Sequence, residues 1–156
     1  MEKEKNTMLK HISQVGILVK NMDKAVEGMK QVFGVEPDSW GQTPETKRKY
    51  KGKEAKFAAK MAFYRFANIE IELIEPLYGE SSWKDYIDRG KEGIHHIRFS
   101  VDNFEKTVSS MKERGICMLQ EGCSVKSEKL RWGLFDTEET LSFIVEIFNE
   151  FEEIKN

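Results

Sequence analysis

The sequence predicts an α+β fold in which two tandem βαβββ modules form an eight-stranded, cupped mixed sheet with helices on its outer face. The first observation behind it is an internal repeat. The segment QVGILVKNMDKAVEGMKQVFG, from Gln14, matches HIRFSVDNFEKTVSSMKERG, from His96, at six identical positions with a constant spacing of 82 residues. The second is that the apolar residues change from period two to helical spacing at the same place in each copy.

Each copy starts with a strand of alternating apolar residues and continues into an amphipathic helix. An asparagine suited to cap the helix stands before it, and a glycine suited to end it follows. These residues are Asn21 and Gly34 in the first copy and Asn103 and Gly115 in the second. Both copies therefore predict the same order of strand, cap, helix and exit.

More strand-like sequence follows each helix. The expected strands are 60–66 and 69–75 in the first half, and one beginning at 116–119, then 130–136 and 141–148 in the second. The stretch 41–56 is expected to be irregular. We expect one domain over residues 1–156, made of two modules at about 10–78 and 92–150 and joined by a short helix near 81–90.

Composition excludes several classes of protein. Charged residues make up 33% of the chain, and the net charge of −2 argues against a nucleic-acid binder. No apolar stretch is long enough to cross a membrane, and the first ten residues lack a signal-peptide core. Cys117 and Cys123 have no zinc or redox spacing, so reduced thiols and a cytoplasmic location are expected.

Four polar residues stand opposite the apolar faces of their strands, in repeat-related pairs. We call them the tetrad: Gln14, Glu72, His96 and Glu146. In a cupped sheet they would point inward together. Two carboxylates, one imidazole and one amide oxygen suit a divalent ion such as Zn²⁺, Ni²⁺, Co²⁺, Mn²⁺ or Mg²⁺. The alternative is a polar, solvent-facing side of an antiparallel sheet, which needs no metal.

The repeat, together with the segments ELIEPL, GIHHIRFSVDN and FIVEIFN, resembles the vicinal oxygen chelate superfamily over residues 12–149. That superfamily includes glyoxalase I, methylmalonyl-CoA epimerase, extradiol dioxygenases and bleomycin-resistance-type binding proteins. The resemblance implies paired βαβββ modules with four metal-ligand positions on the inner face, which fall on the tetrad. His95 is expected to alternate to the other face as a structural residue.

The resemblance also implies a divalent-metal-dependent isomerase or lyase that works through an enolate or enediolate. In that chemistry Glu146 would be the principal base and Glu72 its counterpart. Arg98, on the face of His96, would bind a substrate carboxylate or phosphate, or else form a surface salt bridge. A small-molecule substrate, either an acyl-CoA or a thiol adduct, and a homodimer are expected.

Two enzyme activities are consistent with the sequence. The runs IELIEPLYGESS and GKEGIHHIRFSVDN are similar to methylmalonyl-CoA epimerases, whereas the Gln, Glu, His and Glu set is that of a zinc-type glyoxalase I, a lactoylglutathione lyase. The alternative to an enzyme is a non-catalytic small-molecule binding protein of the bleomycin-resistance type. An extradiol dioxygenase would need a second imidazole where Gln14 stands. The basic residues within 47–60 would clamp coenzyme A phosphates or form a solvated loop.

Overall fold

A computed structural model describes residues 8–149. In the first half the elements are β1 (Ile12–Leu18), α1 (Met22–Phe33), β2 (Ser39–Gln42), β3 (Arg48–Tyr50), β4 (Lys53–Glu54), β5 (Ala58–Arg65), β6 (Glu70–Tyr78) and α2 (Ser82–Asp88). In the second half they are β7 (Gly93–Ser100), α3 (Phe104–Glu113), β8 (Met118–Ser124), β9 (Ser127–Phe135), α4 (Glu138–Leu141) and β10 (Ile144–Phe148).

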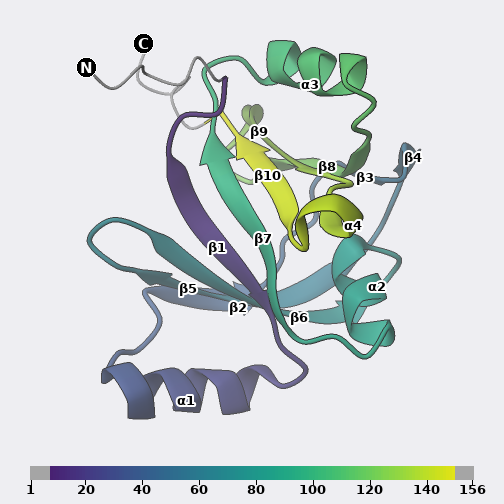
Figure 1. Ribbon diagram of the computed structural model, residues 1–156. Coiled ribbons are helices and arrows are strands. Elements are labelled where there is room, and N and C mark those ends of the chain that lie inside the picture. Colours follow the sequence, from purple (N-terminus) through teal and green to yellow (C-terminus); the bar gives the residue numbers. More distant parts are fainter. Residues whose placement is uncertain (1–7, 150–156) are drawn as a thin grey trace.

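All ten strands belong to one mixed sheet, with the order β2-β5-β6-β1-β7-β10-β9-β8-β3-β4. At its centre β1 runs parallel to β6 and antiparallel to β7, and β7 runs parallel to β10. The two repeat strands thus lie side by side, and each is flanked by the last strand of its own half. The sheet curls into a half-barrel (Figure 1). The predicted α+β fold with repeated modules and a cupped sheet is confirmed.

The sheet has ten strands where eight were expected, because the stretch 41–56 is not wholly irregular. It contains the end of β2 and the short hairpin of β3 and β4, which turns at Lys51 and Gly52. Both turn residues have positive φ, 50° and 77°, as a tight hairpin turn requires. The side chains of this hairpin are mostly polar or charged, so it carries no hydrophobic alternation. Since β3 pairs with β8 and β2 pairs with β5, residues 43–47 cross between the two ends of the sheet.

The last connection also differs from expectation. The strand expected over 141–148 begins only at Ile144, because residues 138–141 form α4. The helix ends at Ser142, whose φ of 64° is left-handed. Thr137 holds the turn: its hydroxyl donates to the carbonyl of Phe143 and accepts from the N–H of Val145, each at 2.9 Å.

The expected helix caps are present in both repeats. The Asn21 carboxamide oxygen accepts from the N–H of Lys24, and that of Asn103 accepts from the N–H of Lys106, both at 2.9 Å. Gly34 ends α1 in the left-handed conformation, with φ 69°. Matching local chemistry therefore starts both repeat helices at equivalent positions.

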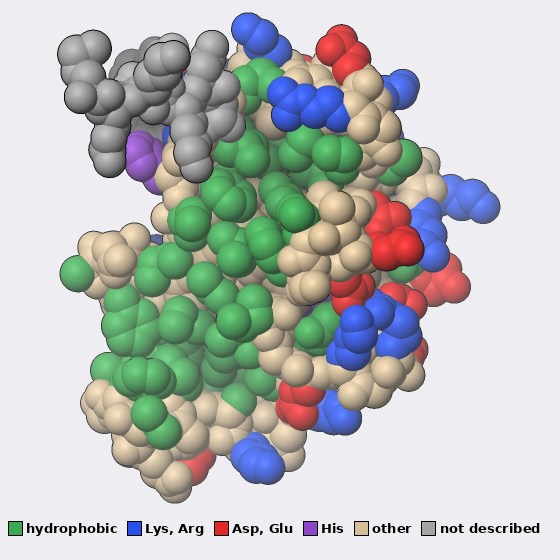
Figure 2. Space-filling view, viewed as in Figure 1, with side chains coloured by type: hydrophobic (Ala, Val, Ile, Leu, Met, Phe, Trp, Pro, Cys, Tyr) green, Lys and Arg blue, Asp and Glu red, His purple; other side chains and the backbone are tan. Residues whose placement is uncertain are grey.

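Helices α1 and α3 cover the outer face near opposite ends of the molecule (Figure 1). Met22 of α1 packs against Tyr64 and Leu73. In the second half α3 packs against Val145 and Ile147 of β10. The face of the sheet between these two helices shows an apolar surface (Figure 2). Since strand residues alternate, covering this face leaves Glu72 and Glu146 on the other one.

Within residues 8–149, no helix is long and apolar enough to cross a bilayer. Cys117 and Cys123 are both free thiols. The outer limits of the expected domain, 1–7 and 150–156, lie outside the described residues.

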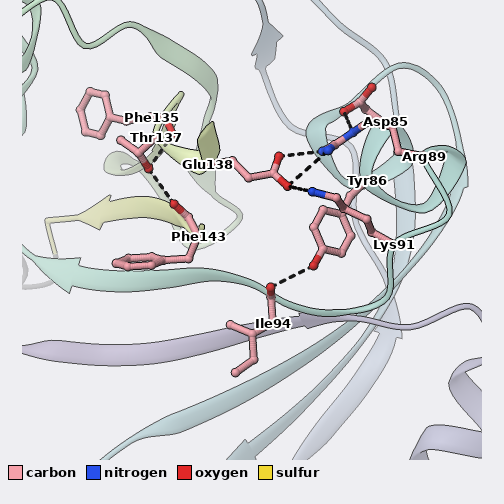
Figure 3. A network of polar contacts seen from close by, with 9 residues as sticks. All are labelled: Asp85, Tyr86, Arg89, Lys91, Ile94, Phe135, Thr137, Glu138 and Phe143. Atoms are coloured by element: carbon pink, nitrogen blue, oxygen red, sulfur yellow. Dashed lines mark hydrogen bonds and ion pairs between the residues drawn. The ribbon is translucent and has the colours of Figure 1, made fainter. Parts of the chain in front are cut away.

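An ionic network joins α2 to α4 (Figure 3). The Glu138 carboxylate accepts hydrogen bonds from Arg89 Nη2 at 2.7 Å and Lys91 Nζ at 2.6 Å. Arg89 also donates to Asp85, one turn earlier in α2, at 2.9 Å. Partial burial would raise the pKa of Glu138, but the hydrogen bonds from Arg89 and Lys91 outweigh it and lower that pKa.

We expect Glu138→Gln to reduce the free energy of unfolding by less than about 1 kcal/mol at neutral pH, because the pairs are partly exposed. The pKa of Glu138 is lower in the folded chain than its ordinary 4.5. Its contribution is therefore complete above pH 4.5 and disappears as the pH falls through the folded value. Denaturant unfolding of both proteins across this range measures the difference. The exposed neighbour Glu139, changed to Gln, is the control; an equal effect from that variant would contradict the role of the network.

Candidate active site

The tetrad lies on four adjacent strands at the centre of the sheet: Glu72 on β6, Gln14 on β1, His96 on β7 and Glu146 on β10. The strand register brings it together, since Gly16 of β1 is the Cα partner of both Glu72 and His96. All four residues are buried, with at most 7% of any of them exposed. The sheet thus gathers residues that lie up to 132 positions apart in the sequence onto one inner face.

The imidazole of His96 is the centre of the tetrad. Its Nε2 atom lies 3.0 Å from Glu146 Oε2, 3.3 Å from Glu72 Oε2 and 3.4 Å from Gln14 Oε1. The three facing atoms are all oxygens, so Nε2 meets only acceptors. This is the geometry of a nitrogen that holds either a proton or another cation.

The two carboxylates determine the charge of the imidazole. Burial alone would lower the pKa of His96, but Glu146 and Glu72 outweigh it and raise that pKa from 6.5 to about 9. Burial raises the pKa of Glu72; Glu146 adds to this rise and His96 opposes it. His96 is therefore a cation at neutral pH, held between two carboxyl groups.

The ring of His96 lies directly against the backbone of Gly16. A Cβ atom at that position would fall 2.0 Å from Cε1 and 2.2 Å from Nε2 of the ring. Such a contact is impossible without moving the ring, so only glycine is compatible with this arrangement. The glycine in QVGILV, opposite His96 in the register, is thus a part of the site that the sequence pattern did not single out.

Glu70 orients the amide of Gln14. The Nε2 of Gln14 donates to Glu70 Oε1 at 2.7 Å. Because a carboxylate only accepts, the amide nitrogen must face Glu70, which leaves the amide oxygen facing His96. The parallel pairing of β6 with β1 makes Glu70 the partner of Gln14.

His95 was expected to lie on the face opposite His96, and this expectation is wrong. The register between β1 and β7 shifts between Gly16 and Ile17, whose partners are His96 and Ile94. His95 is the extra residue of this bulge, and both histidines are 1% exposed. Burial lowers the pKa of His95 well below 6.5, and His96 lowers it further. A period-two pattern assigns alternate faces and does not anticipate a bulge.

The tetrad forms part of the lining of a cavity of about 230 Å³. Trp83 of α2 and Trp132 of β9 line it and stack with their ring centroids 6.2 Å apart. The cavity thus has polar and aromatic walls from both halves of the chain. That combination can hold an organic substrate beside the carboxylates.

Two arginines also line this cavity, Arg98 and Arg48. Arg98 donates to Ser13 Oγ at 2.9 Å and lies 4.0 Å from Glu70. The salt bridge expected as an alternative to substrate binding is thus present, but it lies in the cavity and not on the surface. Arg48 donates to the main-chain carbonyls of Phe57 and Pro44, at 2.6 and 2.5 Å. Nothing in the sequence of the basic stretch 47–60 distinguishes Arg48 from its basic neighbours.

The donor set fits a divalent ion. Two carboxylate oxygens, an imidazole nitrogen and an amide oxygen converge, and these are ligands that such ions accept. In residues 8–149 no three His, Cys, Asp or Glu side chains are already spaced around an ion; the imidazole nitrogen instead contacts both carboxylates directly. Binding would replace the proton on that nitrogen with the metal.

We expect Gly16→Ala to lower the free energy of unfolding by about 1–3 kcal/mol, because the added methyl group overpacks the contact with His96. The shift of the ring should also change the NMR signals of His96. Gly28→Ala is the control, since a Cβ there meets nothing within 4 Å in α1, and it should stabilise the helix by up to about 1 kcal/mol. Equal stability of Gly16→Ala and the parent, with unchanged His96 signals, would disprove the close contact.

Curated relatives of the chain are methylmalonyl-CoA epimerases. The mitochondrial enzyme of Bos taurus is 26% identical over 118 residues, which are 75% of this chain and 61% of that protein. The enzyme of Homo sapiens is 26% identical over 114 residues, 72% of this chain and 58% of that protein. The chain therefore spans about three fifths of the length of these relatives.

Solved structures share the fold. Methylmalonyl-CoA epimerase from Mycobacterium tuberculosis superposes with a TM-score of 0.70 at 13% identity, over 98% of this chain and 96% of that one. A hypothetical protein from Bacillus halodurans C-125 gives 0.69 at 21% identity, over 93% and 97%. A Streptomyces coelicolor methylmalonyl-CoA epimerase variant in complex with 2-nitronate-propionyl-CoA gives 0.68 at 17% identity, over 92% and 96%.

The family model of the glyoxalase/bleomycin resistance protein/dioxygenase superfamily matches residues 13–131. The match includes both repeat strands, the hairpin of β3 and β4, and three residues of the tetrad. With the cupped sheet and its buried polar centre, this match agrees with the resemblance carried by the sequence motifs. The chain belongs to the glyoxalase/bleomycin resistance protein/dioxygenase superfamily.

Proposed function

We propose that this chain is a divalent-metal-dependent epimerase or isomerase, which moves the proton beside a thioester carbonyl of an acyl-CoA through an enolate. The observation that carries the proposal is the pair of buried carboxylates, Glu72 and Glu146, on either side of His96 Nε2. Two such groups in one cavity are the acid and base that proton transfer to either side of a planar carbon needs.

Each residue of the tetrad would have a role that follows from its chemistry. The tetrad would hold the ion, which supplies Lewis-acid polarisation of the substrate carbonyl. Glu146 would accept the proton beside that carbonyl, and Glu72, whose pKa is raised by burial, would return one from the other side. Gln14, oriented by Glu70, would supply a neutral oxygen that takes no part in proton transfer.

The cavity supports an anionic organic substrate. Arg98 and Arg48 lie in its lining, beside the indoles of Trp83 and Trp132. Arginine recognises carboxylates and phosphates well, and an acyl-CoA carries phosphates. The curated relatives are methylmalonyl-CoA epimerases, whose name points to a substrate of this kind.

A glyoxalase I-like activity on a thiol adduct is the second candidate, and the specific observation for it is Gln14. Its amide oxygen faces His96 in the tetrad, and the resemblance assigns a Gln, Glu, His and Glu set to that enzyme. The two candidates share the proton transfer and differ in substrate. A binding protein without chemistry is the outcome if neither substrate reacts.

The assembly and location are also proposals. We propose a homodimer that uses the apolar surface between α1 and α3 seen in Figure 2. Val15 and Ile97, paired across β1 and β7, are half-buried. By strand alternation they lie on the face opposite Gln14 and His96, and a second copy would cover them. A cytoplasmic location is in keeping with the free thiols of Cys117 and Cys123.

The activity is tested by exchange of the substrate α-proton in deuterated water, followed by NMR. Methylmalonyl-CoA and the hemithioacetal of methylglyoxal and glutathione are compared, with the metal-loaded protein. We expect exchange with methylmalonyl-CoA, and a loss of at least about 100-fold in Glu146→Gln because the base is removed. Glu139→Gln, which changes an exposed carboxylate, should exchange like the parent. Full exchange by a metal-loaded Glu146→Gln would show that Glu146 is not the base.

Metal binding is tested by calorimetric titration with Ni²⁺ and Co²⁺. We expect Gln14→Ala to bind both ions more weakly, because it loses one ligand, and Gln14→His to bind them more tightly, because imidazole is the stronger donor. Elemental analysis of the parent, purified without chelator, identifies the resident ion. If Gln14→Ala and the parent bind equally well, Gln14 is not a ligand, and the binding-protein alternative gains support.

A further inference from the structure

The two adjacent histidines of β7 touch each other through the same type of ring nitrogen. His95 Nδ1 and His96 Nδ1 are 3.0 Å apart, and the rings are nearly perpendicular, at 87°. Adjacent residues of a regular strand point to opposite faces, so this contact exists only because of the bulge at His95. Both histidines are 1% exposed, and His96 lines the cavity of the tetrad.

Two imidazole nitrogens in contact can share one proton, so one of them donates and the other accepts. The opposite nitrogen of His96, Nε2, faces the three oxygens of the tetrad. A neutral histidine that binds a metal through Nε2 carries its proton on Nδ1. In that state the Nδ1–H of His96 points at His95, whose Nδ1 must then be the acceptor.

The position of His95 is fixed from its other side. The ring of Tyr86, from α2, packs edge-on against His95 with the centroids 5.1 Å apart. The Tyr86 hydroxyl donates to the carbonyl of Ile94 at 3.1 Å, which ties α2 to the same bulge (Figure 3). Arg89 and Lys91 lie 5.6 Å from the Tyr86 ring centroid. Helix α2, between the two halves of the chain, thus holds the His95 ring in place.

We propose that His95 is a positioning residue: its Nδ1 accepts the Nδ1–H of His96 and so holds the His96 ring with Nε2 toward Gln14, Glu72 and Glu146. Outer partners of this kind fix the tautomer and the orientation of a metal-binding histidine. The inference rests on the metal site of the proposed function. Its geometric part, the contact between the two Nδ1 atoms, is present in the metal-free protein and can be tested separately.

The first test uses the parent protein without metal, labelled with ¹⁵N. NMR should detect a coupling between the two Nδ1 nuclei across the hydrogen bond, with the proton directly bonded to His96 Nδ1. A missing coupling, or a proton carried by His95 Nδ1, overturns the inference. This measurement needs no variant, so it decides the matter even where a substitution at His95 prevents folding.

The second test compares two variants of His95 by calorimetric titration with Zn²⁺ and Ni²⁺. His95→Phe keeps an aromatic ring against Tyr86 but has no acceptor, and we expect it to bind each ion about 10- to 100-fold more weakly. His95→Asn places an amide oxygen near the position of Nδ1, so it should recover most of that affinity. His11→Phe, the same change at an exposed histidine outside the lining of the tetrad's cavity, should bind like the parent.

The outcomes separate the inference from the proposed function. Unchanged affinity in His95→Phe, or equal losses in His95→Phe and His95→Asn, overturns the positioning role, because a purely structural residue would not distinguish an acceptor from a ring. A parent that shows the coupling but binds neither ion overturns the metal site and leaves the hydrogen bond between the histidines confirmed.

Discussion

The site depends on the contact of the His96 ring with the backbone of Gly16. The ring can reach the oxygens of Glu72 and Glu146 only because β1 has no side chain where the ring lies. Overpacking at such a place moves the side chain or the strand. The position of one imidazole therefore links the register of β1 with β7 to the charge of the site, and the neighbouring strands supply the groups that surround it.

The repeat explains why four donors meet at one point. Each half contributes its first strand and its last strand, and the two halves join through β1 and β7. The halves differ in detail: an amide stands on β1 where the second copy has an imidazole, and the residue left out by the register shift just before it is Ser13 on β1 but His95 on β7. Gly16 and Arg98 occupy equivalent positions of the repeat. They differ because β7 carries the His96 ring, and only β1 has to leave room for it.

The sequence was sufficient for the features that periodicity and repetition encode. The paired modules, the caps at Asn21 and Asn103, and the inward face of the tetrad follow from alternation and spacing. Features that depend on pairing between distant segments were not predictable in this way. The hairpin of β3 and β4 pairs with β8 through backbone groups, and its charged side chains give no pattern. The orientation of His95 also depends on strand pairing, because a one-residue bulge reverses the face that alternation assigns to it.

Charge balance favours a divalent ion over a single proton at the centre of the tetrad. Counted within the tetrad alone, two ionised carboxylates and one imidazolium would leave one negative charge among buried groups, and burying a charge is costly unless it is paired. A divalent ion bound by a neutral imidazole would balance both carboxylates, and Gln14 would add an oxygen without adding charge. A second imidazole at position 14 would keep that balance, but it would compete for a proton, whereas the amide does not titrate. The exchange of an imidazole for an amide thus preserves the charge that the ion requires and removes one group whose protonation would oppose binding.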